Sequence, residues 1–102
     1  MKLDDKIRNR RISYLLKREQ STAFELALLY YILATRRTSE DKITDACRKS
    51  VQWLQTAGFQ VVDNIKYLTP AEKLESIEKI IVGNRAILLE RQASVAARHP
   101  DL

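Results

Sequence analysis

Glycine and proline are scarce in this chain, with only two of each among 102 residues. Sheet-rich folds need many turns, and these two residues serve most of the tight ones. Their scarcity argues against a sheet-rich fold and favours long helices. Apolar residues still make up 45% of the chain, which is enough for a hydrophobic core and argues against disorder.

Cysteine and histidine each occur once, as Cys47 and His99. One cysteine cannot form an internal disulfide, and one residue of each kind cannot build a zinc site of the usual type within one chain. Gly58 and Gly83 are too few for a glycine-rich phosphate loop. We therefore expect a protein that is not an enzyme, with no catalytic residues, no metal and no cofactor.

Long hydrophobic runs are also missing. The longest apolar stretch covers residues 26–34, nine residues, whereas a helix needs roughly 20 to cross a bilayer. The charged N-terminus is not followed directly by an apolar run, so we expect no signal peptide. We expect a cytoplasmic protein with no membrane partner.

Positive charge is present in excess, and all of the excess lies at the front of the chain. Residues 1–37 carry nine Lys or Arg and four acids, which accounts for the whole net charge of +5. The other residues carry nine charges of each sign. A basic surface confined to one region predicts a polyanionic partner, of which nucleic acid is the commonest.

The hydrophobic pattern predicts four helices. They cover residues 3–19, residues 22–36 with Thr22 and Glu25 as a capping box, a third from Thr38 or Ser39 to Ala57, and residues 70–98. The second is apolar on every face, so it must be buried either centrally or in a subunit interface. We expect one helical domain over residues 1–98 and a frayed tail over 99–102.

Residues 59–68 allow two interpretations. Two short runs rich in β-branched and aromatic residues flank Asp63 and Asn64, a pair suited to a tight hairpin turn. The alternative is a short helix, with apolar residues at helical spacing from Val61 to Leu68. The first interpretation predicts a mainly α fold, in which a three-helix core carries a short β-hairpin wing and a long C-terminal helix. The second predicts an all-α bundle of about five helices.

The C-terminal helix carries a heptad-like apolar seam that is typical of packing against another helix, often its symmetry mate. We expect a homodimer through this helix. The predicted interface residues are Leu74, Ile77, Ile81, Asn84, Leu88 and Val95.

A local pattern spans the end of the third helix and the residues that follow it. The apolar residues Val51, Leu54 and Ala57 precede Gly58, and then come Phe59 and Val61. This pattern resembles the end of the recognition helix and the first wing strand of winged helix-turn-helix proteins, and Tyr67-Leu68-Thr69-Pro70 resembles their junction to a C-terminal helix. The resemblance covers residues 20–75.

The resemblance implies a small homodimeric nucleic-acid-binding protein, a regulator of transcription that binds duplex DNA at two half-sites. The third helix would then contact base edges or phosphates through its polar face. The residues on that face are Thr44, Arg48, Lys49, Gln52 and Gln55. The basic N-terminal helix would add non-specific phosphate contacts. The residues concerned are Arg8, Arg10, Arg11, Lys17 and Arg18.

A second function fits the sequence as well. If residues 59–68 are helical, the chain is an all-helical module for protein–protein interaction or oligomeric assembly, without catalytic activity. Its apolar second helix and the seam of its last helix would then contact a partner protein. A strand at residues 59–68 favours the DNA-binding function, and a helix there favours the interaction module.

Overall fold

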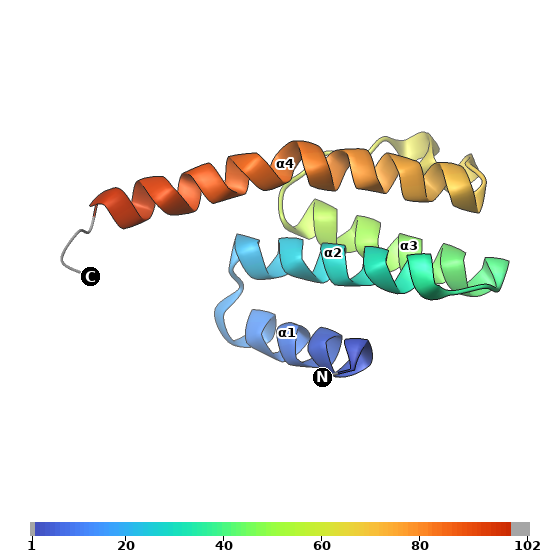
Figure 1. Ribbon diagram of the computed structural model, residues 1–102, viewed down its shortest axis with the longest axis horizontal. Helices are drawn as coiled ribbons and strands as arrows, with labels where there is room; N and C mark the ends of the chain where they lie inside the picture. Colours follow the sequence, from blue (N-terminus) through green and yellow to red (C-terminus); the bar gives the residue numbers. More distant parts are fainter. Residues whose placement is uncertain (1, 99–102) are drawn as a thin grey trace.

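The computed structural model describes the backbone of residues 2–98 and the side chains of residues 2–62 and 64–85. The elements are α1 (Leu3–Lys17), α2 (Gln20–Arg36), α3 (Glu40–Thr56), the 3₁₀ helix η1 (Asp63–Tyr67) and α4 (Pro70–Arg98). Figure 1 shows the four α-helices running roughly parallel or antiparallel to one another, with the second half of α4 extending beyond the bundle. The prediction of a mainly α fold is therefore confirmed.

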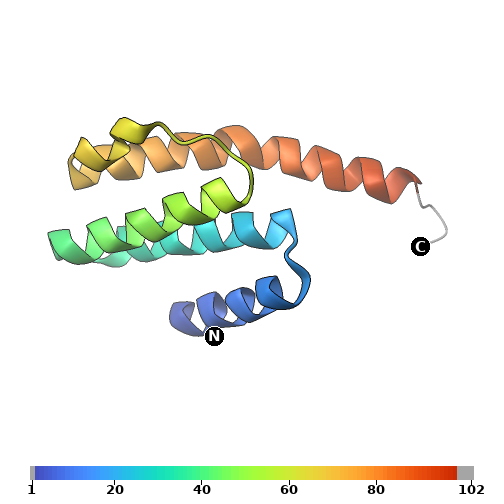
Figure 2. The ribbon, with the colours of Figure 1, turned by 180° about the vertical axis from the view of Figure 1, so that it is seen from behind.

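The central helix is α2. Figures 1 and 2 show α1 on one side of it and α4 on the other, with α3 packed along it. Seven of its residues are buried, and they include Ala23, Leu26, Ala27 and Tyr30. Its neighbours within the chain therefore bury much of α2, while several of its other apolar side chains are only half-buried.

The main core lies between α2, α3 and α4, while α1 packs with α2 in a smaller cluster around Ile7. Small residues such as Ala27 and Ser50 line the contact of α2 with α3, and both are fully buried. The Ser50 hydroxyl donates a 2.7 Å hydrogen bond to the Ala27 carbonyl oxygen. This bond satisfies a polar group in the core and fixes the axial position of α3 against α2.

Two helix ends are set by capping motifs that the sequence predicts. Gly58 takes a left-handed φ of +92°, and the Phe59 N–H bonds back to the Leu54 carbonyl at 3.0 Å, which is the Schellman pattern. At the start of α4, the Thr69 backbone N–H and hydroxyl both donate to a Glu72 carboxylate oxygen, at 3.1 and 2.8 Å.

The capping box predicted at Thr22 and Glu25 is wrong. Helix α2 begins two residues earlier, at Gln20, and Glu19 precedes it without a side-chain capping bond. Thr22 is buried, and Glu25 pairs with Arg10 of α1 at 3.1 Å. Both side chains are thus used for contacts with other parts of the chain rather than for the helix end.

The predicted hairpin wing over residues 59–68 is also wrong. No strand occurs within residues 2–98, and Asp63–Tyr67 forms η1 instead. Phe59 packs edge-on against Phe24, with ring centroids 5.6 Å apart, and Ile65 packs against the main core. Both apolar residues pack against the same core cluster, so the segment follows the bundle surface instead of reversing into a ribbon. The helical alternative was closer, with four α-helices and one 3₁₀ helix in the described chain.

The predicted seam of α4 is partly used inside the chain. Ile77 and Ile81 are buried in the main core and Leu74 packs against it, because α4 must cover α2 and α3. The Asn84 side chain donates to the Ile80 carbonyl of its own helix at 2.7 Å. Two further predicted interface residues, Leu88 and Val95, lie outside the residues whose side chains are described.

No helix within the described residues is long and apolar enough to cross a membrane.

Candidate functional site

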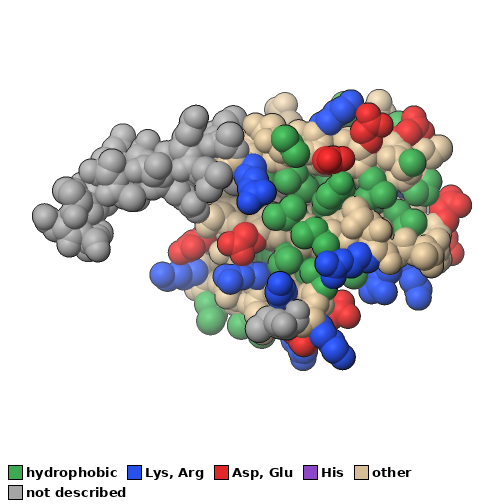
Figure 3. Space-filling model, viewed as in Figure 1, with side chains coloured by type: hydrophobic (Ala, Val, Ile, Leu, Met, Phe, Trp, Pro, Cys, Tyr) green, Lys and Arg blue, Asp and Glu red, His purple; other side chains and the backbone are tan. Residues whose placement is uncertain are grey.

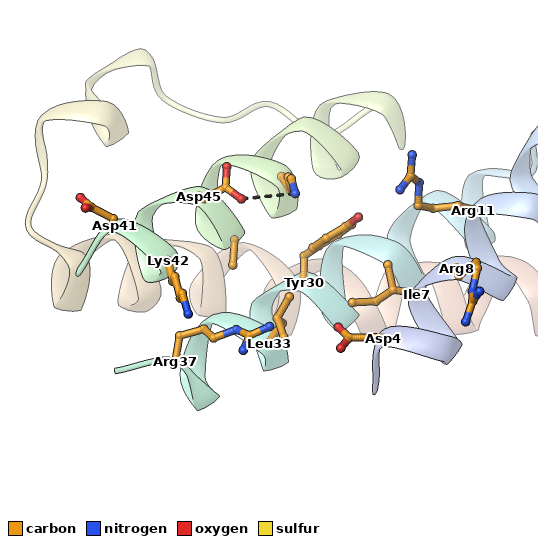
Figure 4. A pocket seen from close by; sticks show the side chains of 12 residues that line it. Asp4, Ile7, Arg8, Arg11, Tyr30, Leu33, Arg37, Asp41, Lys42 and Asp45 are labelled. Carbon is orange, nitrogen blue, oxygen red and sulfur yellow. Dashed lines mark ion pairs between the residues drawn. The ribbon is translucent and has the colours of Figure 1, made fainter. Parts of the chain in front are cut away.

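A groove runs between α1, the C-terminal half of α2 and the first half of α3, and we call it the basic groove (Figure 4). Its volume is about 560 Å³. Five cations and three carboxylates line it, so the lining has a net charge of +2. The lining residues are Asp4, Ile7, Arg8, Arg11, Tyr30, Leu33, Arg37, Asp41, Lys42, Asp45, Ala46 and Lys49.

Helix packing positions these cations. Ile7 and Tyr30 are buried together, and this contact holds α1 against α2. In Figure 4, Arg8 and Arg11 project from α1 at one end of the groove, while Arg37 and Lys42 lie toward the end where α2 passes into α3. Charges far apart in the sequence therefore lie around one hollow.

Three of the five cations are available to a ligand. Arg8 pairs with Asp5 at 2.6 Å and Lys49 pairs with Asp45 at 3.3 Å. Arg11, Arg37 and Lys42 form no ion pair with any residue whose side chain the structure describes. They are also exposed, so their charge faces solvent across the groove.

Asp45 is the carboxylate most strongly engaged by cations. Hydrogen bonds from Arg48 and then Lys49 hold the pKa of Asp45 below its ordinary value. Its negative charge is therefore matched locally, which weakens the repulsion that it would exert on an incoming phosphate. Asp4 and Asp41 remain as carboxylates at the rim.

The groove continues along α3 into a second hollow, which shares Arg11, Tyr30 and Lys49 with it and adds Trp53 and Gln52. Lys49 lies over the Tyr30 ring, 5.8 Å from its centroid. Trp53 meets Tyr14 of α1 edge-on, with ring centroids 5.0 Å apart. The aromatic side chains thus join α1 to α3 beneath the cations.

The basic groove unites part of the predicted nucleic-acid site. Arg8, Arg11 and Lys49 are predicted residues that line it. Sequence reasoning missed Arg37 and Lys42. Arg37 follows Arg36 at the end of α2, where a cation interacts favourably with the helix dipole. This structural role explains both arginines, so the sequence did not indicate that Arg37 lines a binding site.

The other predicted cations lie elsewhere. Arg10 pairs with Glu25 at 3.1 Å, and it lines a separate hollow between α1 and α2. Lys17 lies 3.8 Å from Glu19. Arg18 ends α1 in a left-handed conformation, with its backbone N–H bonded to the Tyr14 carbonyl oxygen.

The polar face predicted for α3 lines a different cavity. Thr44, Arg48, Gln52 and Gln55 all lie in a hollow of about 370 Å³ between α3, η1 and α4, which we call the η1 pocket. Its other lining residues are Cys47, Val51, Ile65, Lys66 and Lys73. The face is therefore flanked by η1 and α4, and only Gln52 is shared with the hollow beside the basic groove.

Exposed apolar side chains form a third surface. Ile12, Leu15 and Leu16 lie on one face of α1, with exposed fractions of 51, 69 and 81%. Figure 3 shows, on another part of the surface, hydrophobic side chains gathered over α2 and between α2 and α4, with many Lys and Arg side chains toward α1.

In the described part of the chain, no cluster of three or more His, Cys, Asp or Glu residues could hold a metal ion. Cys47 is buried, and burial raises the pKa of its thiol, although Lys73 opposes this. His99 lies outside the described residues.

The fold and the groove define a small helical protein with a cation-rich surface concavity. Comparison with protein-family models, with curated proteins and with solved structures found no match to this chain.

Proposed function

We propose that the protein is a non-catalytic nucleic-acid-binding protein, and that the basic groove is where it contacts the phosphate backbone. The observation that carries this proposal is a set of three cations that pair with no described side chain and line one hollow. Arg11 lies on α1, Arg37 is the residue that follows α2, and Lys42 lies on α3. A cation that already has a carboxylate partner adds little binding free energy when it contacts a phosphate. A cation without such a partner neutralises the phosphate and releases the counterions bound there, which favours binding.

The geometry favours backbone contacts over base reading. Arg48, the cation of the predicted reading face, is engaged by Asp45 at 2.7 Å. The described residues contain no strand that could serve as a wing. We therefore propose binding with little sequence preference, with duplex DNA as the first probe. Action as a winged-helix regulator of transcription has less support, because the predicted wing is wrong.

The test is fluorescence anisotropy of a labelled random-sequence duplex, and of one of its single strands, with two charge-matched double variants. Arg11→Gln with Arg37→Gln removes two groove cations. The control, Lys17→Gln with Arg36→Gln, removes the same charge from α1 and α2, but from residues that do not line the groove.

We expect the groove variant to bind about tenfold or more weakly at low salt, and its salt slope to fall by about 2, which is one unit for each lost phosphate contact. The control should change affinity much less. Equal losses in both variants would show that net charge, and not the groove, carries the binding, and would refute the proposed site.

A second function has its own observation. Leu15 and Leu16 are exposed at 69 and 81% beside Ile12, and Val82 of α4 is exposed at 66%. The three apolar side chains of α1 form a group of the kind that marks interaction sites, whereas Val82 is a single exposed residue of α4. We propose that α1 or α4 also contacts a protein partner, and that the simplest partner is a second copy of the chain, as predicted for α4.

Sedimentation velocity tests this second function. We expect a dimer that Leu16→Glu or Val82→Glu converts to a monomer, and the sensitive variant identifies the helix. A monomer at all accessible concentrations would exclude the homodimer.

A further inference from the structure

The η1 pocket has the size and lining of a small-molecule site. Its volume of about 370 Å³ lies within the range of roughly 300–1,000 Å³ that is typical of ligand pockets. Its walls come from three elements, α3, η1 and α4. It lies against a different part of α3 from the basic groove, so an inference about it does not depend on the proposed function.

The apolar part of the pocket is a wall of Cys47, Val51 and Ile65. Cys47 is 1% exposed, and Val51 and Ile65 pack against the main core. Because these residues are held by the core, the wall is preformed. An apolar ligand that covers it would remove apolar surface from water, which favours binding.

The charged part of the pocket is purely cationic. Arg48, Lys66 and Lys73 line it, and no Asp or Glu is among its lining residues. Arg48 is engaged by Asp45. Lys66 and Lys73 form no ion pair with any described side chain, and Lys66 lies over the Tyr67 ring, 5.1 Å from the centroid. The pocket therefore carries two ammonium groups, one from η1 and one from α4, that pair with no carboxylate among the described side chains.

An apolar wall, together with two cations that pair with no described side chain, is complementary to an anion with an apolar body. We propose that the η1 pocket binds a small organic carboxylate with an apolar body, which packs on Val51 and Ile65 while its carboxylate accepts hydrogen bonds from Lys66 and Lys73. Thr44, Gln52 and Gln55 offer further polar groups at the edge. Binding would join η1 to α3 and α4.

The experiment is an NMR titration of the ¹⁵N-labelled protein with 2-naphthoate, using 2-naphthalenemethanol as a neutral analogue of similar shape. We expect saturable shifts at the amides of Val51, Ile65 and Lys73, and weaker binding of the alcohol. Lys66→Gln and Lys73→Gln should each weaken naphthoate binding by about tenfold, as expected for the loss of one charged hydrogen bond.

Lys79→Gln is the matched control, because Lys79 is an exposed cation of α4 that pairs with Glu75 and does not line the pocket. It should leave naphthoate affinity unchanged. All these lysines lie on the surface or at a pocket edge, so we expect the variants to fold, and circular dichroism checks this. Shifts that do not saturate, equal binding of the alcohol, or equal loss in the control would each overturn the proposal.

Discussion

At the scale of single residues, the two glycines have opposite roles. Gly58 ends α3 with a φ of +92°, a conformation in which any side chain is strained. Gly83 lies inside α4, and a methyl group added there would meet no described heavy atom within 4 Å apart from its chain neighbours and the backbone of its own helix. The same substitution at the two positions therefore tests whether conformation or packing space decides stability.

We expect Gly58→Ala to lower the free energy of unfolding by about 1–2 kcal/mol, the cost of a left-handed conformation for a residue with a Cβ. Gly83→Ala should raise the free energy of unfolding by about 1 kcal/mol, because alanine is the better helix former. Urea denaturation followed by circular dichroism measures both. The same sign of change in both variants would contradict the assignment of the two backbone conformations.

Which of Arg36 and Arg37 lines the groove could not be predicted from the sequence. Arg36 and Arg37 are neighbours at the end of the same helix, and either could serve the helix dipole. Only the path of the chain from α2 into α3 turns Arg37, and not Arg36, toward the groove. That path depends on how α2 and α3 pack, and no local pattern in the sequence records it.

At the scale of elements, local signals predicted the helices well. The extent of α4 and its Thr69–Glu72 cap follow from short-range chemistry, as does the end of α3 at Gly58. The hairpin alternative for residues 59–68 was wrong, and the helical one was closer, because the choice between strand and helix there depends on tertiary contacts. Phe59 and Ile65 both pack toward the core, which no short-range rule for Asp-Asn turns could reveal.

The contact between α2 and α4 makes stability depend on alkaline pH. Burial, followed by the charge and hydrogen bond of Glu78, raises the pKa of Tyr31 above its ordinary value of 10.0. The folded state therefore holds this proton more tightly than the unfolded state does. The resulting stability is complete below the unfolded pKa and is lost as pH rises through the higher folded pKa.

Tyr31→Phe keeps the ring and removes the titrating hydroxyl. We expect the free energy of unfolding of this variant to fall less than that of the wild type between about pH 8 and about pH 11. Urea denaturation at the two pH values gives the comparison, and the Cys47 thiol, whose pKa burial also raises, titrates in both proteins. An identical or steeper fall in the variant would contradict the contact.

At the scale of the whole molecule, the positive charge that is concentrated at the front of the sequence lies partly around one groove. The sequence predicted a basic front end and a polyanionic partner for it. The fold divides those cations: Arg8, Arg11 and Arg37 line the groove with two cations from α3, and Arg10 pairs with an acid on another side. Composition therefore predicted the amount of charge, whereas its position required the packing of α1 on α2.

The most direct test of this account is the affinity of the wild-type protein for a labelled random-sequence duplex across a salt series from about 50 to about 200 mM. With three to five groove cations in contact with phosphates, the slope of log K against log salt concentration should lie between about −3 and about −5. No binding at the lowest salt, or an affinity that does not change with salt, would contradict the proposed nucleic-acid-binding function.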